Sequence, residues 1–449
     1  MRMATAPWAG RRLHFIGIGG AGMSGLALVS RRLGAAVSGS DRAPSSYGER
    51  LREHGIEPVI GHAATNVPEG AEVVVSTAIP DSNAELERAR SDGARVLHRG
   101  DLLAELAGLK RCIAVSGTHG KTTTSAMVAH ALIASGHDPA YLVGGELRST
   151  GRNAGWGTGE WVVVEADESD RSFLKLAPEV AVITNVELDH HATYRSSLEL
   201  DRAFESFAAA AARTIVWERV ELELAGARET FGIEAGDLAA RDIELVPLGS
   251  RFTVEGTLVE LGVPGRHNVL NALAALSACR AAGLDVASAA PALRGFTGAA
   301  RRFEPRGRTP AGALVYDDYA HHPTEVRATL EAARTLGAER VVACFQPHLY
   351  SRTARLAREF GTALAVADLV AVLDVYPARE RAQDHPGVSG WLVAAAAADA
   401  AAGRRVWWVP QMADAERLLT AELRAGDVLL TLGAGDVDRL AHALVAAPA

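Results

Sequence analysis

Residues 111–136 contain the feature that most restricts the fold of this chain. An apolar run, RCIAVS, leads into GTHGKTTT, and AMVAHALIASG continues at helical spacing. In a strand, loop and helix of this kind, backbone N–H groups surround phosphates, Lys121 reaches the terminal phosphates, and Thr122 can hold Mg²⁺. The general pattern has a glycine six residues before the lysine, where this chain has Val115. The segment predicts a shortened variant of the nucleoside-triphosphate loop; the alternative is a capped helix start without a ligand.

The composition is that of an intracellular enzyme with several domains. A length of 449 residues implies about three domains, and 48% hydrophobic residues allow a full core. The net charge of -8 argues against a nucleic-acid surface. Because Cys112, Cys279 and Cys344 are widely separated, neither disulfides nor a structural zinc site are expected. We therefore expect a cytoplasmic protein.

Glycine residues dominate the N-terminal segment LHFIGIGGAGMSGLALVS. This uncharged stretch follows Arg11 and Arg12, so a signal peptide or membrane anchor is one interpretation. Five glycines would weaken a membrane-spanning helix, whereas a short strand followed by GxGxxG at residues 17–22 is typical of dinucleotide binding. Asp41, about twenty residues later, is placed to bind a ribose hydroxyl. The pattern fits the diphosphate of NAD or of UDP, and we expect no membrane insertion.

Short apolar strands alternate with helices from end to end, which predicts an α/β protein with parallel sheets. The first unit has expected strands near 13–18, 35–39 and 72–76. The alternation predicts three domains with the limits 1–109, 110–300 and 301–449.

Polar clusters follow the apolar strands, at the carboxyl edge where open α/β sheets bind ligands. Glu165 ends WVVVE, and Asp189 and His190 end the next strand region. Hard oxygen ligands from Glu165 and Thr122 suit Mg²⁺, and His190 can serve a second ion. The alternatives are a solvated acidic loop for EADESD and a capping role for His190 with His191. His321 and His322 have no third ligand at a spacing that suits zinc.

The order of the motifs along almost the whole chain resembles the Mur ligase family. They are FIGIGGAGMSGLA, GTHGKTTT, EADESD, NVELDH, HNVLNALAAL, RRFE, DDYAHHPTE, FQPHLYSRT, DVYPARE and LGAGDV. The resemblance implies a Rossmann-like N-terminal domain that binds UDP, a central P-loop ATPase domain with a mostly parallel sheet, and a Rossmann-like C-terminal domain that admits an amino acid. It also implies an ADP-forming ligase of peptidoglycan precursor synthesis. The implied substrates are ATP, UDP-N-acetylmuramate and L-alanine, with two Mg²⁺ ions and a monomer or weak homodimer.

The resemblance assigns roles by matching position. The expected contacts to the UDP substrate are Gly17, Gly19, Gly20, Gly22, Asp41 and Ser76. The expected contacts to ATP are Gly117, Thr118, His119, Gly120, Lys121, Thr122, Thr123, Asn268, Asn271, Arg302, Asp317 and Asp318. The expected metal ligands are Thr122, Glu165 and His190. Tyr319, His348 and Arg352 are expected at the amino acid or the muramoyl carboxylate, and the expected catalytic residues are Lys121, His119, Glu165, His190 and Arg302.

Two positions depart from the family pattern. Ala192 stands where an acidic residue is common, and Leu349 where an arginine is common. Leu349 removes a cation near the substrate, so Arg352 would have to compensate more of the negative charge of the substrate. Three other functions stay open: a nicotinamide-dependent dehydrogenase, a non-catalytic ATP switch, and a sibling ligase that recycles murein peptides.

Overall fold

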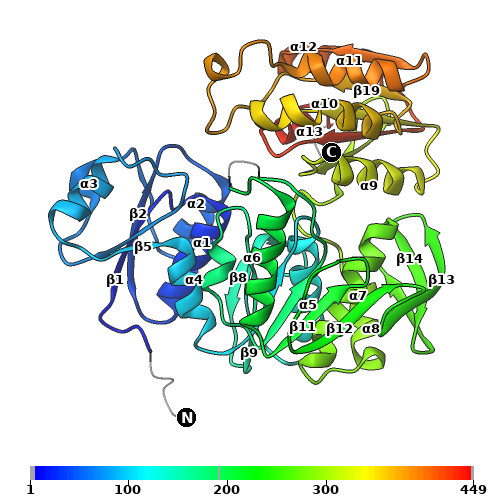
Figure 1. Cartoon of the computed structure of the whole chain (residues 1–449). Helices are drawn as coiled ribbons and strands as arrows, with labels where there is room; N and C mark the ends of the chain where they lie inside the picture. The colour runs from blue at the N-terminus through cyan, green and yellow to red at the C-terminus, as the bar shows by residue number, and fades with distance from the viewer. Residues whose placement is uncertain (1–5, 191–192, 446–449) are drawn as a thin grey trace. The chain divides into compact units, whose positions relative to one another are not determined.

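The computed structural model describes residues 6–190 and 193–445 (Figure 1). The chain divides into two compact units. The first contains Met1–Ala240 and Leu270–Leu293, and the second contains Arg241–Val269 and Arg294–Ala449. None of the helices in the described ranges has the length and apolarity needed to cross a bilayer.

The first unit begins with a parallel sheet of five strands in the order β3-β2-β1-β4-β5. The strands are β1 (Arg12–Ile16), β2 (Ala36–Asp41), β3 (Val59–Ile60), β4 (Glu72–Val75) and β5 (Val96–His98). The helices are α1 (Ala21–Arg32), α2 (Ser46–Glu53), α3 (Ala84–Ser91) and α4 (Arg99–Ala107). The order changes direction between β1 and β4, so the loops after these two strands border the crevice where such sheets bind ligands. The three strands expected in this region are confirmed.

A second sheet in the same unit surrounds the GTHGKTTT segment. Its order is β12-β11-β10-β6-β9-β7-β8, parallel except for the β7–β8 pair. The strands are β6 (Arg111–Ser116), β7 (Ala140–Leu147), β8 (Arg152–Trp156), β9 (Trp161–Glu165), β10 (Val180–Ile183), β11 (Arg213–Trp217) and β12 (Ala227–Ile233). The helices are α5 (Lys121–Ala134), α6 (Ser197–Ala209), α7 (Arg266–Ala281) and α8 (Val286–Arg294). Central strand β6 is buried on both faces, which explains its continuous apolar run.

The two sheets of the first unit are joined through α1, which packs against β7 and β8 (Figure 1). Gly25 lies where an added Cβ would be 3.1 Å from the Cβ of Ala154, so the small residue permits this close approach. Asn153 Nδ2 donates a hydrogen bond to the backbone oxygen of Ala21 (2.6 Å). One face of the glycine-rich helix is therefore packed against the second sheet.

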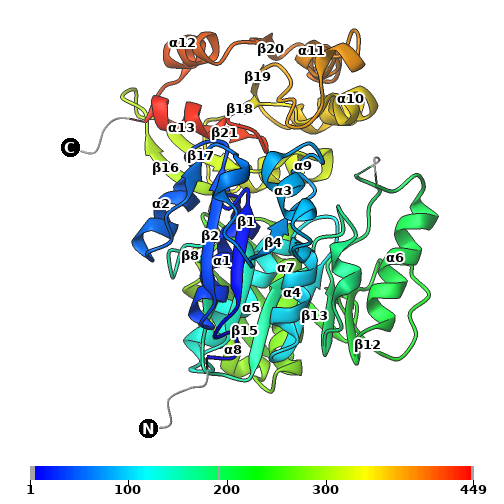
Figure 2. The same ribbon diagram turned by 90° about the vertical axis from the view of Figure 1, so that its left-hand side faces the viewer.

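The second unit contains a six-stranded sheet in the order β16-β17-β21-β18-β19-β20, antiparallel only at β16–β17. The strands are β16 (Glu304–Arg308), β17 (Leu314–Asp318), β18 (Arg340–Phe345), β19 (Leu369–Val372), β20 (Arg405–Trp408) and β21 (Asp427–Leu432). The helices are α9 (Pro323–Arg334), α10 (Tyr350–Leu364), α11 (Gly390–Ala400), α12 (Met412–Glu422) and α13 (Asp438–Leu444). Ala343 on β18 belongs to the core under α9–α11, and its neighbours Val342 and Cys344 belong to the core under α12 and α13 (Figure 2).

An antiparallel extension also belongs mainly to the second unit. Strand β13 (Leu238–Val246) pairs with β12 through its first residues, and its later residues pair with β14 (Gly249–Val254). Strand β14 in turn pairs with β15 (Thr257–Leu261). The fold class is thus α/β with mostly parallel sheets, as predicted. The sequence did not indicate the antiparallel pairs β7–β8, β13–β14, β14–β15 and β16–β17.

A buried carboxylate fixes the loop after β3. Glu85, at the start of α3, is fully buried, and it accepts hydrogen bonds from Ser40 Oγ (2.6 Å) and Asn66 Nδ2 (2.6 Å). His14 Nε2 lies 3.2 Å from the same carboxylate. Burial raises the pKa of Glu85, but the hydrogen bonds from His14, Ser40 and Asn66 outweigh this effect and lower the pKa to about 2.

Because this folded-state pKa is below the unfolded value of 4.5, the stability that Glu85 contributes is present above pH 4.5 and is lost as the pH falls toward about 2. We expect Glu85→Gln to lower the melting temperature near pH 7 and to weaken its fall at acid pH. Melting curves across this range, with exposed Glu87→Gln on the same helix as control, measure the effect. An unchanged acid dependence would show that Glu85 does not control stability.

Candidate functional site

The loop between β6 and α5 is held open by two glycines and a polar scaffold. Gly117 (φ +133°) and Gly120 (φ +81°) have backbone conformations that other residues rarely adopt. Thr184 Oγ1 donates a hydrogen bond to the backbone oxygen of His119 (2.5 Å), and the Asn185 side chain bonds both the N–H and the oxygen of His119 (2.8 and 2.9 Å). The loop therefore presents the N-terminus of α5 in a fixed shape without a side-chain cap.

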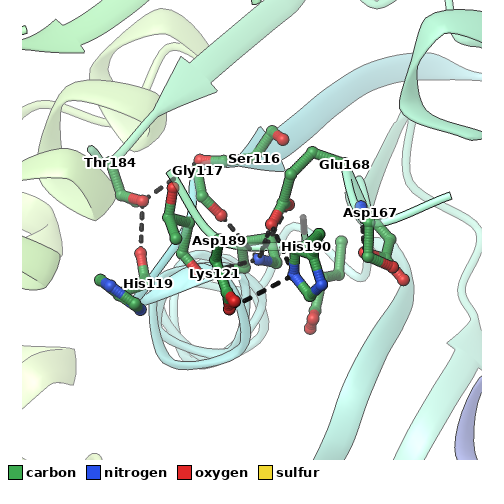
Figure 3. Close-up of polar contacts among 12 residues, drawn as sticks. Ser116, Gly117, His119, Lys121, Asp167, Glu168, Thr184, Asp189 and His190 are labelled. Atoms are coloured by element: carbon green, nitrogen blue, oxygen red, sulfur yellow. Dashed lines mark hydrogen bonds and ion pairs between the residues drawn. The ribbon is translucent and has the colours of Figure 1, made fainter. Parts of the chain in front are cut away.

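Lys121 is folded back over this loop (Figure 3). Its Nζ donates hydrogen bonds to the backbone oxygens of Gly117 (2.6 Å) and Thr118 (3.1 Å) and to Glu168 Oε1 (3.0 Å). Burial lowers the pKa of Lys121, but the carboxylates of Glu168 and Asp167 outweigh this effect, so the pKa is raised. The lysine carries a full positive charge beside the helix N-terminus.

Glu165 and Thr122 lie together at the start of α5. Thr122 Oγ1 donates to Glu165 Oε1 (3.1 Å), and the Gly144 N–H donates to Glu165 Oε2 (2.7 Å). A Cβ at Gly144 would lie 2.6 Å from Glu165 Oε2, so a larger residue there would displace this carboxylate. The pair offers hard oxygen donors, which fit Mg²⁺.

His190 lies beside Glu168. Its Nε2 is 3.5 Å from Glu168 Oε1 and 3.7 Å from Asp189 Oδ2, and its φ of +48° is unusual for a residue other than glycine (Figure 3). The structure thus brings His190 to the acidic loop that also contacts Lys121. His191 and Ala192 lie outside the described residues.

The glycine loop after β1 is held by the carboxylate of Asp41, the last residue of β2. The Gly19 N–H donates to Asp41 Oδ2 (2.8 Å), and Ser45 Oγ donates to the Gly19 backbone oxygen (2.9 Å). Gly17 has φ +82°, whereas Gly20 and Gly22 are exposed at the start of α1. Ser76 follows β4 across the change in strand order. The predicted residues therefore lie at the carboxyl edge of one sheet, and the contact of Asp41 with ribose stays a prediction.

An arginine joins the first sheet to the acidic loop of the second. Arg99 Nη2, at the start of α4, donates to Asp167 Oδ2 and to Asp170 Oδ2 at 2.7 Å each. Burial raises the pKa of Asp167, but Arg99 and Lys121 outweigh this effect and lower it below its usual range. The loop that carries Glu168 is thus fixed from both sides.

In the second unit, the two aspartates at the end of β17 differ. Asp317 is fully buried and accepts hydrogen bonds from Arg301 Nε (2.9 Å) and Thr431 Oγ1 (2.8 Å). Asp318 accepts the N–H groups of Phe303 and Ala320 (2.7 Å each), and burial raises its pKa to about 6. Each Asp318 oxygen can accept a second hydrogen bond, which leaves room for a ribose hydroxyl. The contact of Asp318 with the ATP ribose stays a prediction.

The residues predicted for the amino acid or carboxylate form one cluster. His348 Nδ1 lies 3.2 Å from Arg352 Nη1, and the His348 ring centroid lies 6.0 Å from that of His321. Tyr319 contacts His321 at 5.3 Å between ring centroids, and the Arg302 guanidinium lies 5.3 Å from the Tyr319 ring. Two cations and several aromatic rings therefore gather beyond the carboxyl end of β17.

The remaining predicted residues lie on α5 and α7. Thr123 is buried on α5. Asn271 contacts the phosphate loop, because its Oδ1 is 3.3 Å from Thr124 Oγ1 and would be 2.4 Å from a Cβ at Gly120. Asn268 Nδ2 donates to the Pro264 backbone oxygen (2.7 Å). Contact of either asparagine with adenine stays a prediction.

Sequence reasoning missed Glu168, Asn185 and Arg99. The motif EADESD contains four acidic residues, and nothing in the spacing distinguishes the one that faces Lys121. Asn185 and Arg99 lie far from the loop in sequence and act by tertiary contact, so they gave no local signal.

Comparisons with known proteins agree with this geometry. Family models match residues 12–111 (Mur ligase family, catalytic domain), 115–279 (Mur ligase middle domain) and 301–435 (Mur ligase, glutamate ligase domain). The chain belongs to the Mur ligase family. A UDP-N-acetylmuramate--L-alanine ligase of Acidithiobacillus ferrooxidans is 46% identical and the match covers 96% of each chain; one of Streptomyces coelicolor is 46% identical over 97% of each.

Solved structures of Mur ligases have the same fold. The UDP-N-acetylmuramate-alanine ligase of Thermotoga maritima superposes with a TM-score of 0.84 at 32% identity, covering 96% of this chain and 97% of the other. A murein peptide ligase of Psychrobacter arcticus gives 0.73 at 25% identity, covering 98% and 100%. This Mur ligase therefore has the three α/β domains of the family, and the precise domain limits stay a prediction.

Proposed function

We propose that this chain is an ATP-dependent, ADP-forming ligase that joins L-alanine to the lactyl carboxylate of UDP-N-acetylmuramate, in peptidoglycan precursor synthesis. The observation that supports it most is the full-length similarity to curated ligases of that name at 46% identity. The arrangement of Lys121, Thr122 and Glu165 after β6 supports the use of ATP.

The proposed reaction has two steps. A carboxylate does not react with an amine at neutral pH, so the γ-phosphoryl group of ATP first passes to the lactyl carboxylate oxygen, which releases ADP. The alanine amine then attacks the acyl phosphate, forms the amide and expels phosphate. Both steps place negative charge on oxygen, which Lys121 and Arg302 would stabilise. His119 would lie near the reacting carboxylate.

Mg²⁺ would bind to hard oxygen donors in the first unit. Thr122 and Glu165 would hold one ion and His190 a second, and the bound ions would neutralise charge on the phosphate oxygens. Thr122 Oγ1 and Glu165 Oε1 lie 3.1 Å apart, which supports the proposal that both would bind the same Mg²⁺ ion.

The cluster of Tyr319, His348 and Arg352 would receive the carboxylate of alanine or of the muramoyl group. Leu349 offers no charge, so Arg352, which is 4% exposed, would supply the cation there. We further propose a cytoplasmic enzyme, as a monomer or weak homodimer; three buried free cysteines support a reducing compartment.

The test is ADP release by the purified protein with ATP, Mg²⁺ and UDP-N-acetylmuramate, with amino acids and murein peptide added one at a time. We expect release with L-alanine and a product heavier by one alanine residue in mass spectrometry. Release only with the peptide would identify the sibling ligase, and NAD(P)H oxidation without ADP release would identify a dehydrogenase.

A substitution at Gly19 tests the UDP site. An added Cβ would lie 2.6 Å from Ser45 Oγ and 3.0 Å from Asp41 Oδ2, so these two side chains, which hold the loop by hydrogen bonds, must move. We expect Gly19→Ala to raise the KM for UDP-N-acetylmuramate by about tenfold or more and to leave the KM for ATP nearly unchanged.

Gly108→Ala is the matched control, because its added carbon meets no atom closer than 3.4 Å. Calorimetry on the unmutated protein should detect UDP-N-acetylmuramate binding without ATP and no binding of NAD. Tight NAD binding with no response to the uridine nucleotide would refute the UDP site.

A further inference from the structure

All three N–H groups of the Lys121 ammonium are in use. Two donate to the backbone oxygens of Gly117 and Thr118, and the third faces the carboxylate of Glu168, whose oxygens lie 3.0 and 2.9 Å from Nζ. An ammonium has three donors, so contact with a phosphate requires one of these bonds to break or to be shared.

Glu168 is a buried anion whose position is fixed by its surroundings. It is 1% exposed, and its backbone oxygen accepts a hydrogen bond from Tyr194 (2.8 Å). Its neighbour Asp167 is bound to Arg99. Burying one charge of a pair without the other is costly, so Glu168 compensates the charge of Lys121 when no phosphate is bound.

Apart from Lys121, the carboxylate of Glu168 has one charged neighbour in the part of the chain that the structure describes, His190, whose Nε2 lies 3.5 Å from Oε1. Glu168 Oε1 accepts the Lys121 bond, whereas Oε2, although close to Nζ, has no hydrogen-bond partner of suitable geometry among the described residues. An anion with one satisfied oxygen is easier to displace than one with two. Phosphate oxygens, which carry more charge, can therefore replace it at Lys121.

We propose that Glu168 is a stand-in anion that holds Lys121 over the phosphate loop in the absence of nucleotide and competes with the ATP phosphates for it. This inference rests on the proposed use of ATP. Glu168 is a positioning residue, because it acts on ATP through Lys121. Since the ion pair must be given up on binding, its free energy is subtracted from the affinity for ATP.

The sign of the effect provides the test. Glu168→Gln keeps the shape of the side chain and removes the competing charge. Calorimetry with a non-hydrolysable ATP analogue and Mg²⁺ should give a Kd lower by about threefold or more. The melting temperature of the nucleotide-free variant should fall, and saturating analogue should raise it by more than it raises that of the unmutated protein.

The matched control is Glu160→Gln, at the residue just before β9, whose side chain is 72% exposed and pairs with Arg111. It changes the net charge equally and should leave the Kd unchanged. Glu168→Asp, with a shorter side chain, should tighten the binding of the ATP analogue less than Glu168→Gln does. This variant replaces Glu168→Gln in the test if the latter does not fold.

Equal or weaker binding by Glu168→Gln would overturn the inference, because a residue that only supports the loop would lower the affinity when removed. A loss of affinity that excess Mg²⁺ restores would assign Glu168 to the metal and would also overturn it. If the unmutated protein does not bind the analogue, the proposed function itself is wrong.

Discussion

Replacing Lys121 by alanine should lower turnover by about a hundredfold or more. The physical reason is that no other lysine adjoins the phosphate loop in sequence: Lys121 begins α5, and the other lysines of the chain are Lys110 and Lys175. The measurement is the rate of ADP release at saturating substrates, together with a melting curve. Near-normal turnover in the folded variant would refute the role of Lys121.

The contact of Lys121 with Glu168 calls for a control. Removing the lysine leaves a carboxylate that is 1% exposed without its counter-charge, which destabilises the loop apart from any catalytic effect. The double variant Lys121→Ala with Glu168→Gln removes both charges. We expect it to recover most of the lost melting temperature but none of the turnover. Recovered turnover would mean that the first effect was one of stability.

The second large effect is expected at the metal ligands. Glu165→Ala and His190→Ala should each lower the ligation rate by roughly tenfold or more, because each removes a proposed ligand of Mg²⁺. Raised Mg²⁺ should partly restore at least one of the two, and excess EDTA should abolish activity. The rate is measured as a function of Mg²⁺ concentration.

Glu160→Ala, at the exposed residue just before β9, is the control for Glu165→Ala, and its Mg²⁺ dependence should match that of the unmutated protein. Full activity in EDTA, or variants that are indistinguishable from the unmutated protein, would contradict the metal assignment.

The fold could be predicted because its signals are local. The apolar run of β6, the glycines after β1 and the alternation of strands and helices each depend on a few neighbouring residues. The antiparallel strands β13–β15 gave no such signal, because RDIELVPLGSRFTVEG carries charges on half-exposed hairpins. Tertiary packing also decides the environment of the alanine-rich helix α11: Ala394 and Ala397 are buried, and a Cβ at Gly361 would lie 2.4 Å from the backbone of Ala396.

The candidate site could be predicted only in part. Lys121, Thr122 and Glu165 follow from loop chemistry and strand ends, and the structure brings them together. The difference between Asp317 and Asp318 could not be predicted, since it depends on Arg301 reaching one carboxylate and on two backbone N–H groups reaching the other. Glu168 could not be predicted for the same reason. Four acidic residues occur in EADESD, and only the tertiary structure shows that Glu168 is the one that pairs with Lys121.

The link between Arg99 and the acidic loop limits how this protein can be recombined with its relatives. In a hybrid protein with residues 1–109 taken from a relative, the residue that the relative has in place of Arg99 would face Asp167 and Asp170. Breaking a buried ion pair by removing one partner costs roughly 3–5 kcal/mol, and the 22% exposure of the Arg99 side chain reduces that figure. Domain exchange is therefore expected to succeed only when the arginine and the two aspartates are transferred as one set, and not by a cut at the predicted boundary near residue 109 alone.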